Sequence, residues 1–269
     1  MENSSLLVEP YEIRKIILEQ SKRANVGHIG SALSVADIVA ALYGGAMKTA
    51  KDKAPDRDRF VLSKGHAALA LYAALYLKGY ISRGELGTFC GDGSALGVHP
   101  ESSLGCVDFS TGALGQGLSM AAGAALAARL QNSPRRVFAL LSDGECNEGA
   151  VWEAAAFAAH HKLANLTAII DLNGQQAFGY TKDVLSMSPM AGRWRAFDWD
   201  VRETDGHDIK ALQAALSGPA DGEGRPRMIV ARTVFGKGVP FMEGKIKWHY
   251  WPMSEDEFKQ ALADIEKLK

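Results

Sequence analysis

The sequence predicts an α/β fold, a doubly wound and mostly parallel sheet with helices on both faces. Short apolar runs alternate with longer segments in which apolar residues recur at helical spacing. The apolar runs are continuous rather than alternating, which is typical of parallel strands that are buried on both faces. With 269 residues, of which 47% are hydrophobic, the chain is long enough to bury such a core, and we expect one domain over residues 1–269.

The first part of the chain predicts two helices ahead of the sheet. Apolar residues follow helical spacing over 10–24 and 34–46, and Ser34 is expected to be the N-cap of the second helix. The apolar run 60–62 and the helical segment 67–77 then indicate a strand, a turn and a helix.

The rest of the chain repeats this alternation. A separate strand is expected at 199–203, and residues 235–269 are expected to form an extended C-terminal tail that ends in a short helix. Three predicted helices each lead into an apolar strand, namely 114–131 into 136–142, 148–162 into 166–171, and 208–216 into 228–234.

Charge and cysteine content argue against several classes of protein. The 30 Lys and Arg nearly balance the 31 Asp and Glu, so no long-range field draws the chain to nucleic acid or to an acidic membrane surface. Cys90, Cys106 and Cys146 lack CxxC spacing, which argues against a disulfide framework and a zinc knuckle. The first residues show no signal-peptide pattern and no apolar run approaches the length of a bilayer span, so we expect a cytoplasmic protein.

Oxygen-bearing side chains follow two of the predicted strands. Asp143-Gly144 stands where strand 136–142 ends, and Asn173 stands about thirty residues later, just past the next strand. Because that separation is one βαβ unit, both side chains should emerge at the carboxyl edge of neighbouring strands, where open α/β sheets bind ligands. A carboxylate, an amide oxygen and the main-chain carbonyl of Gln175 suit Mg²⁺. Gly144 permits close approach of the backbone, and the amides of the following helix favour an anionic diphosphate.

Several of these features also have ordinary structural interpretations. Asp-Gly and Asn-Gly dipeptides are common turns, and Asp92-Gly93, which follows no buried strand, is interpreted as a loop of that kind. Of the seven histidines, three are interpreted as structural: His160 and His161 at the end of a helix, and His207 in a turn.

The remaining motifs carry a resemblance to a known family. The stretch from Asp143 to Gln175 resembles the thiamine diphosphate motif, with Ser142 in place of the usual first Gly. Glu148-Gly149 and Trp152-Glu153-Ala154 resemble the transketolase version in particular. The segment DFSTGALGQGLSMAAGAA resembles the transketolase TGxLGQG element. Four further segments resemble transketolase signatures in family order: GHIGSALS with His28, LSKGHAALALY with His66, LGVHPE with His99, and KIKWHYWP with His249.

The resemblance, which covers nearly the whole chain, implies roles for individual residues. His66 and His249 would donate hydrogen bonds to the diphosphate, while His28 and His99 would face the substrate channel, where an imidazole can shuttle a hydroxyl proton. Glu148 and Glu153, which we expect on one helix, match acidic residues that lie at the subunit interface in this family. The other residues that the resemblance assigns to the cofactor and its Mg²⁺, or a substituting Ca²⁺ or Mn²⁺, are Gly112, Leu114, Asp143, Gly144, Glu145, Asn173 and Gln175.

The resemblance stops at the first domain of an ordinary transketolase. Nothing in the chain resembles the pyrimidine-binding domain, which in this family supplies the glutamate that protonates the aminopyrimidine and the arginines that grip the sugar phosphate. The resemblance therefore implies a split enzyme, a ketol transferase that is complete with a partner subunit, as a heterotetramer of two of each. Tyr250-Trp251-Pro252 departs from the family pattern and puts the usual pentose phosphate substrates in doubt. A non-catalytic partner domain and another thiamine diphosphate enzyme are the alternatives.

Overall fold

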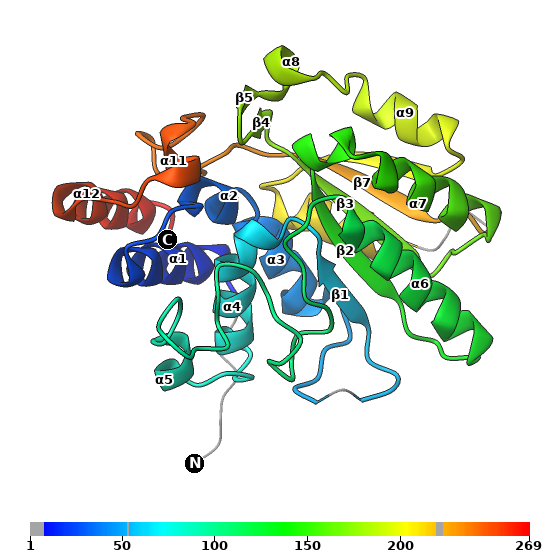
Figure 1. Ribbon diagram of the computed structural model, residues 1–269, viewed down its shortest axis with the longest axis horizontal. Helices are drawn as coiled ribbons and strands as arrows, with labels where there is room; N and C mark the ends of the chain where they lie inside the picture. Colours follow the sequence, from blue (N-terminus) through cyan, green and yellow to red (C-terminus); the bar gives the residue numbers. More distant parts are fainter. Residues whose placement is uncertain (1–7, 53, 219–222) are drawn as a thin grey trace.

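A five-stranded sheet lies at the centre of the structure, and all its neighbouring strands are parallel (Figure 1). This computed structural model describes residues 8–52, 54–218 and 223–269. The strand order is β1-β2-β3-β7-β6, which confirms the predicted α/β class. The strands are β1 (Arg59–Leu62), β2 (Val137–Ser142), β3 (Leu166–Leu172), β6 (Asp200–Asp205) and β7 (Arg227–Arg232).

Helices cover both faces of the sheet, as its parallel strands require. Alternate residues of β2 point to opposite faces: Phe138 and Leu140 join one hydrophobic cluster, and Ala139 and Leu141 join another. Helices α1 (Pro10–Ala24), α3 (Ala36–Ala41), α4 (Ala68–Leu77), α10 (Ile209–Ser217) and α12 (Glu255–Glu266) pack in the first cluster, and α6 (Gln116–Leu130), α7 (Gly149–His160) and α9 (Met190–Ala196) in the second.

The predicted helix over 34–46 is wrong at its start. The chain forms α2 (Ile29–Ser34), breaks at Val35, and continues as α3 and a π-helical turn at Leu42–Ala46. Ser34 is thus the last residue of a helix rather than an N-cap. Its hydroxyl donates a 2.7 Å hydrogen bond to Oδ1 of Asp171 on β3, a buried carboxylate and therefore a strong acceptor.

Short elements connect the larger ones at the carboxyl edge of the sheet. Two 3₁₀ turns, Gly65–Ala67 and Gly144–Asn147, follow β1 and β2. Glu148 is the N-cap of α7 rather than part of it, so it does not share a helix with Glu153 as expected. The remaining short elements are α5 (Arg83–Leu86), β4 (Gln175–Gln176), β5 (Gly179–Tyr180), α8 (Thr181–Val184) and α11 (Lys247–Tyr250).

The C-terminal segment 235–269 packs against the rest of the chain. Helix α12 lies beside α1, at the left of Figure 1, and Trp248, Met253 and Ile265 are buried in the first cluster. This segment carries α11 against α2 and brings His249 close to His66 in the turn after β1. Within the described ranges, no helix is both long enough and apolar enough to span a bilayer.

Candidate active site

The loops after β2 and β3 bring Asp143 and Asn173 together. These strands are neighbours, with Ser142 in register with Asp171. Asp143 Oδ1 accepts a hydrogen bond from the Gly144 amide at 2.8 Å, and Oδ2 accepts one from the Gly174 amide at 2.7 Å. The carboxylate therefore joins the two loops.

A buried carboxylate that the sequence analysis did not single out orients Asn173. Oδ2 of Asp171 accepts a hydrogen bond from Asn173 Nδ2 at 2.9 Å, and Ser34 Oγ accepts another from the same nitrogen at 3.2 Å. Asp171 also accepts hydrogen bonds from Ser34 and Thr233 and forms an ion pair with Lys64. With its nitrogen held in this way, Asn173 turns its oxygen toward the Gln175 amide, which donates to it at 2.9 Å.

The Lys64–Asp171 pair lies inside the protein, with side chains 1% and 0% exposed. Charged residues are rarely this buried unless they are paired. A signal for both was present in the sequence, because each stands at the carboxyl end of an apolar strand: Lys64 two residues past β1 and Asp171 within β3. Lys64 lies within the LSKGHAALALY segment and Asp171 within the stretch from Asp143 to Gln175, but the resemblance assigned a role to neither residue.

The residues around Asp143 fit a hard cation. Burial, and next the negative charge of Asp171, raise the pKa of Asp143 to about 7. A bound divalent cation would stabilise the ionised carboxylate. Within the described part of the chain, no three His, Cys, Asp or Glu side chains converge into a metal site. An ion here would therefore rely on one carboxylate together with amide and main-chain oxygens, which suits Mg²⁺.

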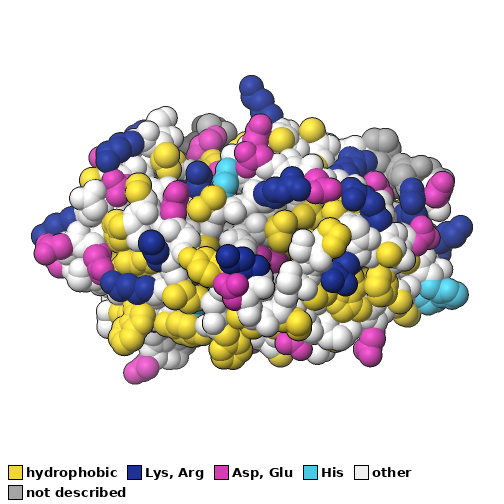
Figure 2. Space-filling model, turned by 90° about the horizontal axis from the view of Figure 1, so that it is seen from above, with side chains coloured by type: hydrophobic (Ala, Val, Ile, Leu, Met, Phe, Trp, Pro, Cys, Tyr) yellow, Lys and Arg dark blue, Asp and Glu magenta, His cyan; other side chains and the backbone are white. Residues whose placement is uncertain are grey.

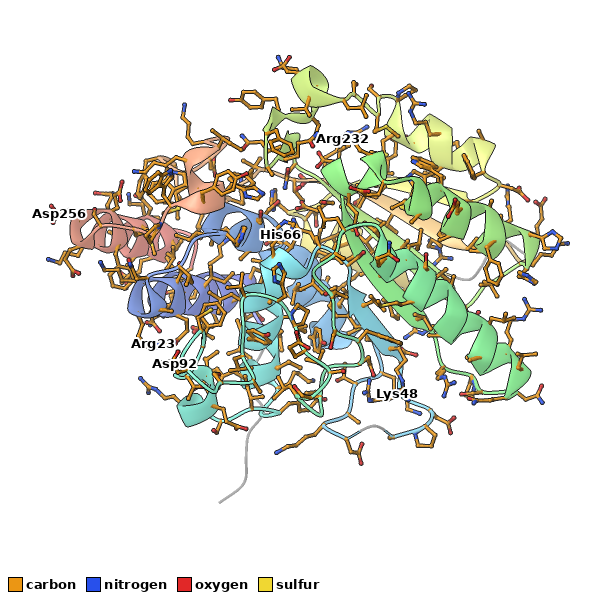
Figure 3. All side chains as sticks on the ribbon, viewed as in Figure 1. Arg23, Lys48, His66, Asp92, Arg232 and Asp256 are labelled. Atoms are coloured by element: carbon orange, nitrogen blue, oxygen red, sulfur yellow. The ribbon has the colours of Figure 1, made fainter. Side chains whose placement is uncertain are left out.

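Three imidazoles meet beside this edge. The ring centroids of His28, His66 and His249 lie 5.2–5.5 Å from one another. They come from the residue ahead of α2, from the 3₁₀ turn after β1 and from α11, and the His28 amide donates to the His249 carbonyl at 3.2 Å. Figure 3 shows His66 at the top of α4, between the N-terminal helices and the start of α6.

The three imidazoles are neutral at physiological pH. Burial is the main cause in each case, because it disfavours the imidazolium ion. The pKa of His66 is lowered well below its usual value, next through the charge of Lys64. The pKa of His249 is lowered to about 4, next through His28, and that of His28 is lowered, next through His99. Each neutral ring can donate one hydrogen bond without bringing a competing positive charge.

Four of the predicted residues, His99, Gly112, Leu114 and Glu145, lie in or against the loop ahead of α6. A Cβ on Gly112, whose φ is +155°, would lie 3.2 Å from the His99 ring. Gly115, at the start of α6, donates its amide to Oε1 of Glu145 at 2.8 Å. Glu145 is buried, and its carboxylate also accepts hydrogen bonds from the Ser63 hydroxyl and the Ser142 amide. It therefore holds the loop that contains Gly115 against the ends of β1 and β2. Leu114 stands in the same loop and is exposed.

Unsatisfied polar atoms concentrate at this site. Among the described residues, the buried side-chain atoms without a hydrogen-bond partner include Nδ1 of His28, Nδ1 of His249, and both Oε1 and Nε2 of Gln175. Such atoms are rare in folded proteins and usually mark a place where another group binds. The imidazole donors can bind a polyanion directly, and the Asp143 carboxylate and the Asn173 amide can hold it through a divalent cation.

The remaining predicted residues lie apart from the three imidazoles. Glu148 and Glu153 are exposed, and Glu148 lies against Gly115 at the edge of the site, since a Cβ on that glycine would come within 2.7 Å of the glutamate Cβ. His160 and His161 contact each other at the end of α7. His207 hydrogen bonds to Asp37 and to the Val234 amide, in accord with a structural role.

The chain is similar to known proteins over nearly its whole length. Residues 8–265 match the family model "Transketolase, thiamine diphosphate binding domain". The chain is 41% identical to the 6-deoxy-6-sulfo-D-fructose transketolase subunit of Clostridium sp. (strain MSTE9), covering 95% of this chain and 94% of that protein. It is 38% identical to an apulose-4-phosphate transketolase subunit of Phocaeicola vulgatus, covering 100% of this chain and 98% of that one.

Solved structures show the same fold. The crystal structure of transketolase from Campylobacter jejuni aligns with a TM-score of 0.89 at 32% identity, over 98% of this chain and 43% of that chain. Transketolase from Pichia stipitis in complex with sedoheptulose-7-phosphate also gives 0.89, at 30% identity over 96% of this chain and 40% of the other. The chain thus spans about two fifths of these solved transketolases.

Proposed function

Since the chain belongs to the transketolase family through its thiamine diphosphate-binding domain, we propose that it is the diphosphate-binding subunit of a two-chain transketolase. One observation carries this proposal. The relatives that it matches over 94% and 98% of their own length are named as transketolase subunits, whereas it covers 43% of the Campylobacter jejuni chain. The proposed reaction transfers a two-carbon ketol group from a ketose donor to an aldose acceptor.

In this proposal, the carboxyl edge of the sheet holds the diphosphate through a metal ion. Asp143, the oxygen of Asn173 and the main-chain carbonyl of Gln175 bind Mg²⁺, or a substituting Ca²⁺ or Mn²⁺. The raised pKa of Asp143 supports this role, because a divalent cation offsets the cost of its buried charge. Lys64 and Asp171 act as positioning residues, because the pair fixes the nitrogen of Asn173 and so aims its oxygen.

The imidazoles supply neutral donors to the cofactor and a proton acceptor to the substrate. His66 and His249 donate N–H groups to diphosphate oxygens, and the backbone of Gly112 and Leu114 contacts the cofactor. Thiamine diphosphate, when bound, supplies the chemistry that breaks a C–C bond and stores the electron pair. His28 and His99 hold and move a proton at a sugar hydroxyl, a task that an imidazole can perform near physiological pH.

The partner chain completes the site. In the proposed assembly, a heterotetramer of two chains of each kind, it binds the aminopyrimidine and the sugar phosphate. Glu148 supports this arrangement, because it is exposed at the edge of the site and is free to face another chain, and Glu153 is exposed on the first turns of α7. The neighbourhood of the cofactor is then closed by both chains.

The proposed substrates are modified or branched sugars rather than the usual pentose phosphates. Two relatives are named for 6-deoxy-6-sulfo-D-fructose and apulose-4-phosphate. Tyr250 and Trp251 support a change of specificity, since they place two bulky, uncharged side chains directly after His249.

The test is a ketol-transfer assay on the pair reconstituted from this chain and the pyrimidine-domain chain of the same organism. A panel of ketose donors is assayed with and without Mg²⁺ and thiamine diphosphate. Asp143→Asn should abolish turnover, whereas Asp92→Asn should leave it unchanged, because Asp92 stands in the other Asp-Gly turn, beside α5 and far from His66 (Figure 3). Turnover by this chain alone would contradict the two-chain proposal. A pair that binds no cofactor by calorimetry would favour a non-catalytic partner domain.

A further inference from the structure

Large aromatic side chains stand exposed beside the site. Phe178 is 86% exposed, Trp251 63%, Tyr250 53% and Tyr180 49%. We call these four residues the aromatic rim. Exposure of one large apolar side chain is common, but four on adjacent loops mark a surface that another molecule covers.

The rim is formed by two segments that are distant in the sequence and are joined by hydrogen bonds. The Tyr250 hydroxyl donates to the Ala177 carbonyl at 2.6 Å, and the Tyr180 hydroxyl donates to the Gly244 carbonyl at 3.2 Å. These two bonds tie the β4–β5 turn to the segment that carries α11. Figure 1 shows the two segments at the same end of the molecule.

The backbone at Tyr250 packs tightly against the segment ahead of α2. A Cβ on Gly27 would lie 2.3 Å from the Tyr250 carbonyl oxygen, so the two backbones are in direct contact. The neighbouring His28 amide donates to the His249 carbonyl. The exposed rings of Tyr250 and Trp251 are therefore anchored at their backbone before any partner binds, which reduces the entropy lost on association.

The rim adjoins the imidazoles and the predicted metal ligands. The Tyr250 ring centroid lies 4.9 Å from that of His249, and Tyr180 pairs with Gln175 in the small sheet formed by β4 and β5. Figure 2 shows the molecule from above, with exposed hydrophobic side chains lying among charged ones on this face.

We propose that the aromatic rim is the surface on which the pyrimidine-domain chain docks. The proposal rests on the proposed function, which requires a second chain to cover the cofactor from this edge. No rim residue carries a charge, so the matching surface of the partner should be apolar and aromatic rather than a patch of one charge. Rigid, exposed Trp, Tyr and Phe are the residues that dominate binding energy at protein interfaces.

The experiment measures the affinity between the full chain and the pyrimidine-domain chain by calorimetry. Trp251→Ala and Phe178→Ala should each raise the dissociation constant about 30-fold or more, as expected for interface hot spots. Leu130→Ala is the matched control, because Leu130 is 76% exposed at the far end of α6 and should change the constant less than about threefold. Circular dichroism and the melting temperature of each free variant show that the fold is retained.

Three results would overturn the proposal or separate it from the proposed function. Wild-type affinity in both rim variants, with an active wild-type pair, would overturn the rim as the docking surface and leave the function standing. An assembled wild-type pair without ketol transfer would refute the function, while weakened binding by the rim variants would still support the interface. The third result is that this chain associates with itself, that both rim substitutions abolish this association, and that partner binding is unchanged. It would assign the rim to a second copy of this chain and overturn the proposed occupant.

Discussion

Replacing Lys64 with Met would leave the Asp171 carboxylate buried without its ammonium partner. Both side chains are almost fully inaccessible to water. Removal of one partner of such a pair typically costs about 3–5 kcal/mol in the free energy of unfolding, because the remaining charge is uncompensated. For a chain of this length, that loss lowers the melting temperature by roughly 6–20 °C.

The second substitution, Asp171→Asn in the Lys64→Met background, removes the remaining charge. Because no ion is then left buried alone, most of the lost stability should return, so the effects of the two substitutions should not add. The orientation of Asn173 should not return, since its nitrogen loses a charged acceptor. We therefore expect a double variant that folds but binds the diphosphate poorly.

The assay combines urea unfolding of the wild type and the variants with calorimetry of thiamine diphosphate and Mg²⁺ binding to the reconstituted pairs. A loss below about 1 kcal/mol in Lys64→Met would refute the reasoning, because it would place the cost of the isolated carboxylate far under the expected range. Equal losses in the single and double variants would refute it as well, since the cost would then not arise from the uncompensated charge.

Three further predictions concern pH, ligands and packing. Between about pH 4 and 7, the raised pKa of Asp143 means that the folded chain without metal keeps a proton that the unfolded chain releases. The stability of the wild type relative to Asp143→Asn, measured by urea unfolding, should therefore fall with rising pH over this interval by up to roughly 4 kcal/mol. A difference that does not change with pH would contradict the assigned pKa. Thiamine diphosphate and Mg²⁺ at 100 times the dissociation constant should stabilise the reconstituted pair by about 2.7 kcal/mol, measured by thermal shift, and removal of Mg²⁺ with EDTA should abolish the gain. Gly117→Ala should destabilise the chain by about 1–3 kcal/mol, because the new Cβ would lie 2.2 Å from Ser63 Oγ, whereas Gly123→Ala on the same helix, where nothing lies within 4 Å, should be neutral or stabilising by up to about 1 kcal/mol; equal effects in the two variants would contradict this packing.

The sheet was predictable because its physical signal is local. Continuous apolar runs such as 136–142 and 166–171 have few alternatives to a buried parallel strand, and consecutive strands in such a sheet often lie side by side. That adjacency is confirmed for β2 and β3 and is what brings Asp143 near Asn173. Their role as metal ligands stays a prediction.

The parts that sequence reasoning missed depend on tertiary contacts. Apolar spacing over 34–46 was compatible with one helix, but Ser34 instead bonds a carboxylate that is far away in the sequence. Lys64 and Asp171 were overlooked because a buried ion pair has no spacing of its own. The expectation that His28, His66 and His249 serve one site came from their resemblance to family signatures. Periodicity could not predict it, since their loops are widely separated along the chain.

The uneven burial of the five tryptophans has a spectroscopic consequence. Trp194, Trp199 and Trp248 are buried and Trp152 is half-buried, while Trp251 projects into solvent. In the free chain, Trp251 should therefore account for most of the intrinsic emission that acrylamide or iodide quenches. Covering this one indole would shift the emission toward the blue and remove the quenchable fraction, so the chain carries its own label-free optical reporter at the edge of the cofactor site.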